Sequence, residues 1–216
     1  MGTTERRKRE KKQRKAQILD TARELLLRDG HHQVSMNRIA RKAELSVGTL
    51  YLYFASREEL FATLQEEGLD LLYEKIREAA DKKGTPEKRL HGIARAYKNF
   101  SEENKNYFDI INSFLASQDI VFSAEMKARV DMHGDNILSC VDEVIRDMGS
   151  EINVEVENSM IRQCSLTFWG NLHGVLIMRK LQDTILKEIT LDQQLTHSST
   201  CCIEGLKTYL LKMKSS

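Results

Sequence analysis

Residues 35–61, SMNRIARKAELSVGTLYLYFASREELF, decide the fold, because nearly every position in this stretch has a recognisable structural role. Ser35 is a suitable N-cap for a short helix over 36–43, and Ser46 is a suitable N-cap for a second short helix over 47–54. A turn of about three residues separates the two helices. Two short helices joined in this way are typical of a helix-turn-helix.

The second predicted helix has one apolar face, and a third helix begins soon after it. The apolar residues recur at the i, i+3, i+4, i+7 spacing of a buried or half-buried face. They are Val47, Leu50, Tyr51 and Phe54. Ser56 and Glu59 then form a capping box, in which each side chain binds a backbone N–H at the start of a helix.

The run Thr49-Leu50-Tyr51-Leu52-Tyr53-Phe54-Ala55-Ser56-Arg57-Glu58 closely resembles the signature of the TetR family of bacterial transcriptional regulators. The resemblance extends from about Ile18 to about Leu64. It implies an all-α fold, with an N-terminal three-helix DNA-binding domain and a C-terminal helical bundle for ligand binding and dimerisation. It also implies a repressor that a small-molecule effector releases from DNA, since repression is the usual mode of the family.

The chain departs from the pattern of the family at two positions. Glu44 stands where the family usually turns through a glycine, so it must adopt an unfavourable backbone conformation or form a different turn. Leu52 stands where many relatives have a basic or polar residue. Both departures bear on the base contacts, and neither alters the expected fold.

Composition agrees with an all-helical chain of one or two domains. The 216 residues are 41% hydrophobic, which is enough for a core, and they include one proline and 11 glycines. The formal net charge of +1 conceals an asymmetry, because residues 1–56 carry 13 Lys and Arg against 6 Asp and Glu. A basic head on an acidic body is typical of a DNA-binding domain joined to a domain that does not bind DNA.

The sequence predicts a cytoplasmic protein that does not cross a membrane. The four cysteines lack the spacing of a secreted disulfide framework, and the basic N-terminus lacks the apolar region of a signal peptide. The longest run without a charge, 163–178, has 16 residues, and a membrane-spanning helix needs about 18 or more.

Three parts are expected along the chain: a basic tail over 1–15, a DNA-binding domain over 16–61, and an effector-binding and dimerisation domain over 62–216. Like charges repel at the density found in the tail, so we expect the tail to be frayed or disordered in the absence of DNA. Near a duplex it would neutralise phosphates without reading sequence, and a purely solubilising tail is the alternative.

Further start and stop signals divide the rest of the chain into helices. The helix after Ser56 continues to about Asp81, and Thr85 with Pro86 begins the next one. Later helices are expected over 86–103, 106–117, 123–148, 154–182 and 192–214. A first helix is expected from Ala16, with Ile18, Ala22, Leu25 and Leu26 on one face, and Gly30 is predicted to end it. Ser123 is the predicted N-cap of the helix over 123–148, and Gly149 is its predicted end.

The predicted DNA-contacting residues lie at the start of both short helices and just after the second one. Val47, Gly48 and Thr49 would face the bases, because a helix-turn-helix places the N-terminal part of its second helix in the major groove. Residues near or on the phosphates would be Ser35, Asn37, Arg38, Ser46, Tyr51, Tyr53 and Arg57. For the tyrosines, simple packing is the alternative.

A homodimer is expected, because one recognition helix buries too little surface to be specific. The candidate interface is the pair of C-terminal helices, which in the family form a four-helix bundle between two chains. Its candidate residues are Gly170, Gly174, Leu181, Leu206 and Leu210, and packing within one chain is the alternative for some of them.

An effector cavity is expected within the bundle. The residues that could line it are aromatic, methionine or polar side chains at helical spacing, which are more often plain core. They are Tyr97, Phe100, Phe108, Asn112, Phe114, Met126, His133, Met160, Phe168, Trp169 and His173. The partners expected are therefore double-stranded operator DNA, a small-molecule effector and a second copy of the chain, with no cofactor and no catalytic residue.

Two other classes of function remain open. An enzyme using Cys164 and His173 is disfavoured, because nine residues place the two side chains on opposite faces of one helix. A metal- or thiol-responsive sensor could use His197, Cys201 and Cys202, and a dimer would double this set of ligands. Ordinary buried cysteines are commoner than such sensors.

Overall fold

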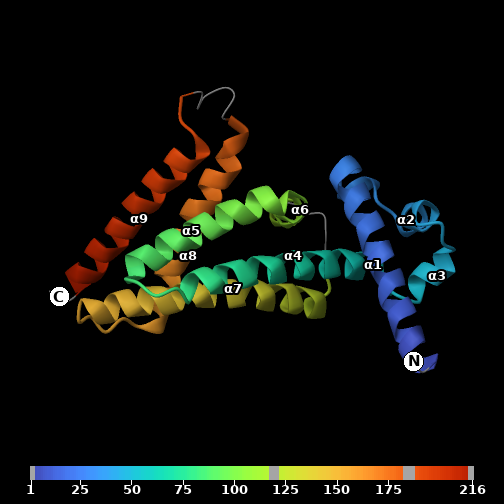
Figure 1. Ribbon diagram of the computed structural model, residues 1–216, viewed down its shortest axis with the longest axis horizontal. Coiled ribbons are helices and arrows are strands. Elements are labelled where there is room, and N and C mark those ends of the chain that lie inside the picture. Colours follow the sequence, from blue (N-terminus) through green and yellow to red (C-terminus); the bar gives the residue numbers. More distant parts are fainter. Residues whose placement is uncertain (1–2, 117–121, 182–187, 214–216) are drawn as a thin grey trace. The chain divides into compact units, whose positions relative to one another are not determined.

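The computed structural model describes residues 3–116, 122–181 and 188–213, and all regular structure within these ranges is helical (Figure 1). The predicted all-α fold is confirmed. The elements are α1 (Thr3–Asp29), η1 (His31–Gln33), α2 (Met36–Lys42), α3 (Val47–Tyr51), α4 (Arg57–Ala80), α5 (Pro86–Glu103), α6 (Lys105–Ala116), α7 (Ala124–Glu151), α8 (Asn158–Met178), η2 (Arg179–Leu181) and α9 (Leu191–Met213). The helix ends predicted at 117, 182 and 214 lie outside the described residues.

Contacts between residues divide the chain into two units. The first consists of Met1–Leu69 and Lys105–Asp131, and the second of Asp70–Asn104 and Met132–Ser216. The first unit therefore contains α1, α2, α3 and α6, while α4 and α7 each contribute residues to both units. The domain boundary after residue 61 that the sequence motif suggests stays a prediction.

The core of the first unit forms around the apolar face of α1. The residues of α1 at helical spacing are fully or almost fully buried, as the pattern predicts. They pack against α2, α3 and the start of α4, and two side chains of α6 join the same cluster. The cluster includes Ile18, Ala22, Leu25, Ile39, Leu50, Phe54, Phe61, Ile110 and Phe114. After α1, Gly30 has a φ of 75°, in the positive region that favours glycine.

The basic N-terminal segment is helical, contrary to the expectation that it is frayed or disordered. The helix α1 begins at Thr3 and continues without a break to Asp29. An ion pair along the helix supports the extension, since Arg6 Nε lies 3.0 Å from Glu10 Oε1, one helical turn further on. The segment therefore presents its cations from a helix.

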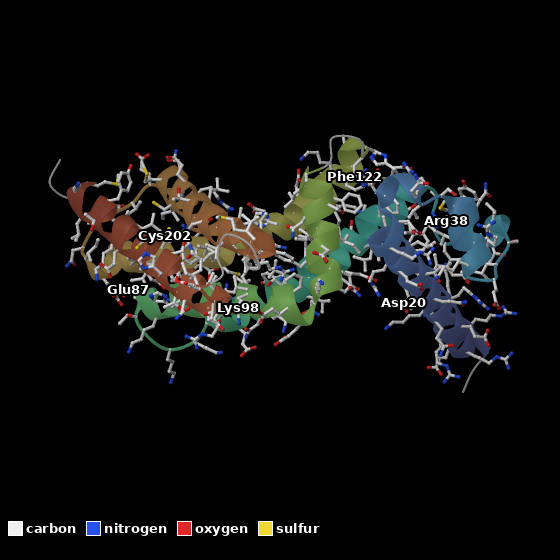
Figure 2. All side chains as sticks on the ribbon, turned by 90° about the horizontal axis from the view of Figure 1, so that it is seen from above. Asp20, Arg38, Glu87, Lys98, Phe122 and Cys202 are labelled. Atoms are coloured by element: carbon white, nitrogen blue, oxygen red, sulfur yellow. The ribbon has the colours of Figure 1, made fainter. Side chains whose placement is uncertain are left out.

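The helices of the second unit are joined by apolar packing and by ion pairs between α5 and α9. Glu87 and Lys98, labelled in Figure 2, lie towards the two ends of α5. Lys207 Nζ lies 2.5 Å from Glu87 Oε1, and Lys98 Nζ lies 2.9 Å from Asp192 Oδ1. Hydrogen bonding to Lys207 lowers the pKa of the Glu87 carboxyl, and hydrogen bonding to Asp192 raises the pKa of the Lys98 amine. Both pairs are partly exposed, and ion pairs in contact with water fix the alignment of two helices more than they stabilise the fold.

The N-caps predicted at Thr85 and Ser123 are confirmed. Thr85 Oγ1 accepts a hydrogen bond from Lys88 N, and Pro86 occupies the first turn of α5. Ser123 Oγ accepts a hydrogen bond from Met126 N at 3.2 Å. No helix in the described part of the chain is both long and apolar enough to cross a membrane.

The prediction that Gly149 ends a helix is wrong. The helix α7 continues to Glu151, and the chain turns at Asn153, which has a φ of 55°. A Cβ at Gly149 would lie 2.9 Å from a methyl of Val156, so this glycine permits a close approach of the chain instead. The turn also explains why α8 begins at Asn158, four residues later than predicted.

Candidate nucleic-acid interface

Serine N-caps hold the two short helices of the helix-turn-helix. Ser35 Oγ accepts a hydrogen bond from Arg38 N at 3.3 Å, and Ser46 Oγ accepts one from Thr49 N at 3.0 Å. The helix α2 has seven residues and α3 has five, and helices of this length are not stable alone. Caps and packing must therefore hold them, and both predicted N-caps are confirmed.

The turn between α2 and α3 contains a glutamate in a left-handed conformation. Glu44 has a φ of 57°, which costs a residue with a Cβ about 1–2 kcal/mol. Leu45 N donates to Ala40 O at 2.9 Å, and Gln17 Nε2 of α1 donates to Ala43 O at 3.0 Å. Of the two outcomes that the sequence left open for Glu44, the structure has the unfavourable backbone conformation.

The helix α3 and the residue after it present an exposed surface. Gly48 is exposed, Val47 and Thr49 are half-buried, and no side chain crowds the Gly48 backbone. Tyr51 is 52% exposed and Leu52 is 78% exposed. The expectation that Tyr51 lies on a buried face is wrong, and simple packing does not explain its position. An exposed aromatic ring with a hydroxyl can contact another molecule.

The chain turns inward directly after α3, which ends three residues earlier than predicted. Tyr53 N and Phe54 N both donate to Leu50 O, at 3.0 and 3.1 Å. Phe54 is buried, and the half-buried Tyr53 packs against the core of the first unit. The contact of Tyr53 with a phosphate stays a prediction.

The hydroxyls of Ser46 and Thr49 lie together at the start of α3. Their oxygens are 2.8 Å apart, and either can be the donor. One hydrogen bond between two hydroxyls uses only one of the two O–H groups. The other O–H remains able to donate to an acceptor outside the protein, such as a phosphate or a base oxygen.

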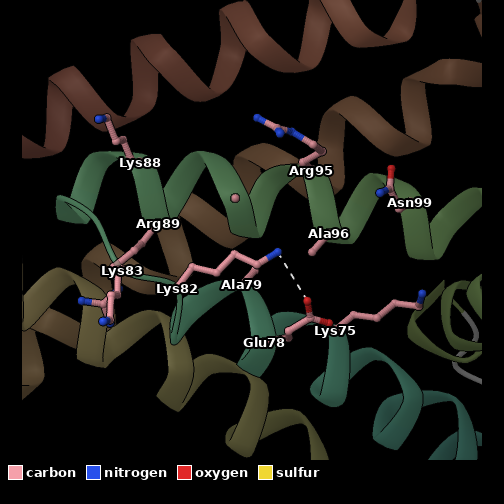
Figure 3. Close-up of a pocket in the computed structure, with 11 residues that line it drawn as sticks. Lys75, Glu78, Ala79, Lys82, Lys83, Lys88, Arg89, Arg95, Ala96 and Asn99 are labelled. Carbon is pink, nitrogen blue, oxygen red and sulfur yellow. Dashed lines mark ion pairs between the residues drawn. The ribbon is translucent and has the colours of Figure 1, made fainter.

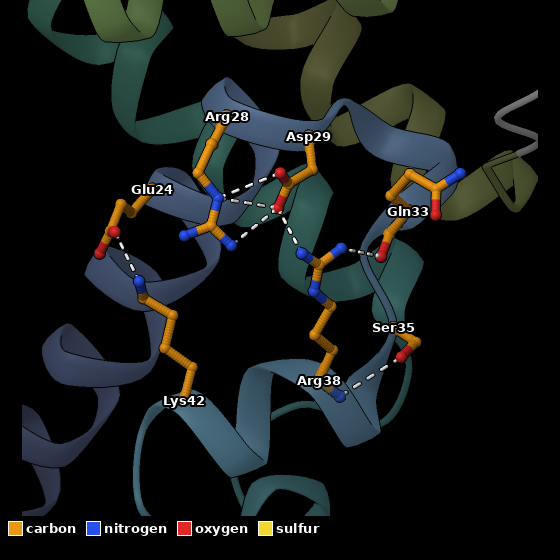
Figure 4. Close-up of polar contacts among 7 residues, drawn as sticks. All are labelled: Glu24, Arg28, Asp29, Gln33, Ser35, Arg38 and Lys42. Carbon is orange, nitrogen blue, oxygen red and sulfur yellow. Dashed lines mark hydrogen bonds and ion pairs between the residues drawn. The ribbon is translucent and has the colours of Figure 1, made fainter.

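The Arg38 guanidinium is held by α1 and the turn after it (Figure 4). Arg38 Nη2 donates to Asp29 Oδ2 at 2.6 Å, and Nη1 donates to Gln33 O at 2.9 Å. Asp29 also accepts from Arg28, and this hydrogen bond lowers the pKa of the Asp29 carboxyl. The pair fixes the direction of Arg38 at the beginning of α2, where Asn37 is exposed. The sequence indicated Arg38 but not Asp29, because nothing in the pattern pairs residues nine apart across a turn.

Arg57 is also engaged within the fold. Arg57 Nε donates to Glu58 Oε1 at 3.0 Å, and Nη1 donates to Val34 O at 3.4 Å. The guanidinium lies 5.6 Å from the centroid of the Phe61 ring. With 34% of the side chain exposed, Arg57 can reach a phosphate only in competition with Glu58.

The cations of α1 form an exposed basic strip before the helix-turn-helix. Every residue over 4–17 is exposed, including all eight Lys and Arg of that segment. Lys42 at the end of α2 lies 2.5 Å from Glu24 of α1. The strip can supply salt-dependent attraction to a phosphate backbone.

Residues 18–64 match the family model described as bacterial regulatory proteins, tetR family. This segment is a TetR-family domain. It covers α2, α3 and the adjoining parts of α1 and α4, so the matched residues are those that build the interface described above.

Relatives of the TetR-type segment are named transcriptional regulators. The chain is 32% identical over 81 residues to the fatty acid metabolism regulator protein of Bacillus subtilis, covering 38% of this chain and 42% of that protein. It is 26% identical over 141 residues to the HTH-type transcriptional activator FasR of Mycolicibacterium smegmatis, covering 64% and 62%. The chain therefore spans less than two thirds of these relatives.

The fold is shared over most of the chain with solved structures of regulators. The transcriptional regulator FadR of Bacillus subtilis in complex with stearoyl-CoA has a TM-score of 0.71 at 18% identity, covering 88% of this chain and 98% of that one. The fatty acid degradation regulator FadR of Bacillus halodurans has a TM-score of 0.66 at 19% identity, covering 87% and 93%. At this identity the likeness concerns the fold alone.

The predicted effector-contacting residues fall into both units. Phe108, Asn112, Phe114 and Met126 belong to the first unit, where Phe114 is part of the core described above. The other seven belong to the second unit, and Met160 lines a groove beside α8 and α9. The rest of that set is Tyr97, Phe100, His133, Phe168, Trp169 and His173.

An aromatic cluster gathers three of these residues between α5 and α8. The Tyr97 and Trp169 rings are stacked with centroids 4.4 Å apart, and Tyr97 Oη lies 2.8 Å from His173 Nδ1. Burial raises the pKa of the Tyr97 hydroxyl and lowers the pKa of the His173 imidazole. A neutral pair of this kind suits the packing of a core, and contact with an effector stays a prediction.

The predicted dimer residues divide into open and buried positions. Gly170 and Gly174 are exposed, and no atom lies within 4 Å of a Cβ built at either position. Leu206 is 7% exposed and Leu210 is fully buried within the chain, while Leu181 is half-buried. The glycines of α8 therefore remain accessible to a second chain, whereas the two leucines of α9 pack within their own.

The cysteine cluster of α9 brings together a pair of potential ligands. Cys201 Sγ lies 3.7 Å from His197 Nε2, and Cys202 is half-buried with a pKa raised by burial. Among the described residues, no three His, Cys, Asp or Glu side chains are grouped closely enough to hold a metal ion.

Proposed function

We propose that this chain is a ligand-responsive transcriptional regulator that binds a palindromic operator as a homodimer, most simply as a repressor. The observation that carries the proposal is the surface at the start of α3, where an exposed backbone and a spare hydroxyl proton lie within the TetR-type segment. Relatives include both the activator FasR and the HTH-type transcriptional repressor KstR. Repression is proposed because it is the usual mode of the family.

In the proposed complex, the first turn of α3 lies in the major groove. Gly48 lets the backbone approach the bases, Val47 offers a methyl to thymine, and the Thr49 hydroxyl donates or accepts. Tyr51 and the exposed Leu52 lie at the other end of the helix, towards the walls of the groove. The basic strip of α1 adds attraction to phosphates that does not depend on sequence.

The proposed dimer forms through α8 and α9. Besides the two open glycines of α8, several large apolar residues of these helices are exposed. They include Leu166 at 51%, Met178 at 46% and Tyr209 at 46%. Small residues that let helices approach closely, with apolar neighbours around them, suit a helix–helix interface.

For the effector, we propose a molecule that carries a fatty acyl chain, as the first class to test. One relative is named a fatty acid metabolism regulator, and a structure of the same fold was solved with stearoyl-CoA. Release from DNA requires that the effector bind more tightly to a form of the dimer that cannot place both recognition helices.

Binding of the purified protein to promoter fragments, across a salt series, tests the DNA-binding part. We expect selective binding to a near-palindromic fragment, weakened by salt and by Thr49→Ala and Tyr51→Ala. The matched control is Ser150→Ala, which removes an exposed hydroxyl from α7, away from both proposed interfaces, and should leave binding unchanged. Weak, sequence-independent binding that neither substitution alters would refute the proposed role of α3.

Titration of the bound operator with stearoyl-CoA, stearate and coenzyme A tests the effector part. We expect stearoyl-CoA to reduce operator affinity, because only a ligand with unequal affinity for two forms shifts their balance. Unchanged affinity at saturating concentrations of all three would refute a fatty acyl effector and leave the DNA-binding part standing.

A further inference from the structure

The end of α4 and the first half of α5 enclose an open groove with a volume of about 350 Å³ (Figure 3). Its floor is made of small residues, Ala79 of α4 and Gly92 and Ala96 of α5. A Cβ at Gly92 would lie 3.8 Å from Ala79 O, so the two helices approach closely there. The hollow exists because the side chains at the crossing are short while those around it are long.

The groove is lined by six cations and one carboxylate. The cations are Lys75, Lys82, Lys83, Lys88, Arg89 and Arg95. The carboxylate, Glu78, lies 3.4 Å from Lys82 Nζ (Figure 3). Lining of this kind attracts anions, since like charges held around one hollow add their potentials.

Three of the cations are paired within the protein, and three are not. Lys75 pairs with Glu103, Lys82 with Glu78, and Arg89 with Asp147. In the part of the chain that the structure describes, the side chains of Lys83, Lys88 and Arg95 have no hydrogen-bond or ion-pair partner.

This concentration runs against the composition of the surrounding chain. Residues 57–216 carry 26 Asp and Glu against 20 Lys and Arg, yet the groove has six cations for one acid. A solvated helix face in an acidic body would mix both signs. Cations around one groove repel one another, and an anion bound there lowers that repulsion.

We propose that this groove binds the linked phosphate groups of a small molecule, a pyrophosphate or nucleoside diphosphate group, between α4 and α5. Lys83, Lys88 and Arg95 make the first contacts, and Arg95 can bind two phosphate oxygens at once. Arg89 holds the site in shape, because its Nε donates to Ala80 O at 2.6 Å at the end of α4.

The open side of the groove leaves room for the rest of such a molecule. Lys88 and Arg95 also line a second hollow of about 470 Å³, between α5 and α9, together with His91 and Ser199. A ligand held by its phosphates can therefore extend along α5 into this neighbouring hollow. The binding of such a ligand does not depend on the proposed function. Its role as the effector does.

Calorimetry on the full chain without DNA tests the proposal. The probes are inorganic pyrophosphate, ADP, coenzyme A and stearoyl-CoA. Inorganic phosphate, citrate and vesicles rich in phosphatidylglycerol serve for comparison. The groove variant combines Lys83→Ala, Lys88→Ala and Arg95→Ala. The control variant removes three exposed cations that do not line the groove, by Lys105→Ala, Lys127→Ala and Arg146→Ala.

We expect saturable binding of pyrophosphate, ADP and coenzyme A, weakened about tenfold or more in the groove variant and unchanged in the control. Similar affinity for ADP and coenzyme A would indicate a free nucleotide as the source of the phosphates. Tighter binding of stearoyl-CoA, still dependent on the groove, would indicate the head group of a thioester.

The proposal is overturned if none of the three phosphate compounds binds, or if the groove variant binds them as well as the wild type. It is also overturned if only vesicles rich in phosphatidylglycerol bind, since that result assigns the cations to a membrane surface. Operator binding of the groove variant without ligand should equal that of the wild type. Failure of the wild type to bind any operator would refute the proposed function and leave the calorimetry result valid.

Discussion

Substitution of Ser46 separates the two roles that the structure gives to this side chain. Ser46 Oγ caps α3 by accepting from Thr49 N at 3.0 Å, and it is hydrogen-bonded to Thr49 Oγ1 at 2.8 Å. Asparagine and aspartate cap helices about as well as serine does, whereas alanine does not. Ser46→Ala, Ser46→Asn and Ser46→Asp therefore differ in capping and in charge.

For stability, only the alanine variant should differ from the wild type. Loss of an N-cap costs about 1 kcal/mol, which corresponds to about 2–4 °C in the melting temperature of a chain of this size. The asparagine and aspartate variants should melt within about 1 °C of the wild type. Thermal unfolding of the four proteins, followed by circular dichroism, measures this difference.

For operator affinity, the three variants should rank differently from their ranking in stability. Ser46→Ala removes a hydroxyl that can donate to a phosphate, and a hydrogen bond to a charged group contributes about 1.5–3 kcal/mol. Two half-sites in a dimer double this loss, so we expect binding to weaken by roughly a hundredfold or more. Ser46→Asn keeps a donor and should bind within about tenfold of the wild type. Ser46→Asp places a carboxylate against phosphate and should bind most weakly of all.

Fluorescence anisotropy with a labelled operator at two salt concentrations measures these affinities. The control is Thr85→Ala, which removes the N-cap of α5 in the second unit and should lower stability without changing operator affinity. If Ser46→Asp binds as tightly as Ser46→Asn, no phosphate lies near this residue. The reasoning about the start of α3 is then refuted.

Further substitutions and a pH series test the packing of the chain. Tyr107→Phe removes a hydroxyl that accepts from Arg23 at 2.6 Å and should lower the free energy of unfolding by about 1–2 kcal/mol in urea titration. Gly149→Ala overfills a close approach at a cost of about 1–3 kcal/mol, whereas Gly134→Ala in the same helix meets open space and should stabilise by up to about 1 kcal/mol. Burial lowers the pKa of His173 in the folded chain, so the unfolded chain binds the proton more tightly. Stability should fall as pH drops below about 6.5, and His173→Gln should reduce that slope in thermal melts; an equal slope in the variant would contradict this account.

Local signals were enough to predict most of the helices. The three N-caps at Ser35, Ser46 and Thr85 each bind a backbone N–H three residues further on. The helix predicted over 86–103 is found at Pro86–Glu103. Caps and apolar spacing act within one or two helical turns, so a single sequence contains what is needed to recognise them.

The wrong predictions depend on contacts made by a later part of the chain, or on where a helix ends. Glycine is a residue type that often ends a helix, which led to the prediction for Gly149. In the structure, Gly149 instead leaves room for the chain that returns beside it after Asn153. Tyr51 has the spacing of a buried position, yet α3 ends there and the ring is left exposed. Helical spacing indicates a face only while the helix lasts.

The sequence indicates the individual residues of the candidate interface, but it does not indicate the contacts that hold those residues in place. Thr49 and Tyr51 follow from the position of a recognition helix, whereas the pairing of Arg38 with Asp29 depends on how α1 ends against α2. That pairing decides whether Arg38 is free to swing towards a phosphate. The Asp29 carboxylate neutralises part of its charge, so Arg38 is expected to orient the helix-turn-helix more than to bind DNA strongly.

The basic groove could not be predicted from the sequence, because its cations are separated along the chain by acidic residues. They are spread over 75–95 on two helices and a turn, among acids that pair with some of them. Averaged over residues 57–216, the charge is negative, and for this reason we expect this part of the chain not to bind DNA. The electrostatic potential that a small anion meets is set by the few charges within a Debye length of about 8–10 Å. Net charge therefore argues against DNA on this part of the chain, and the same composition still permits a site for a phosphate-bearing ligand.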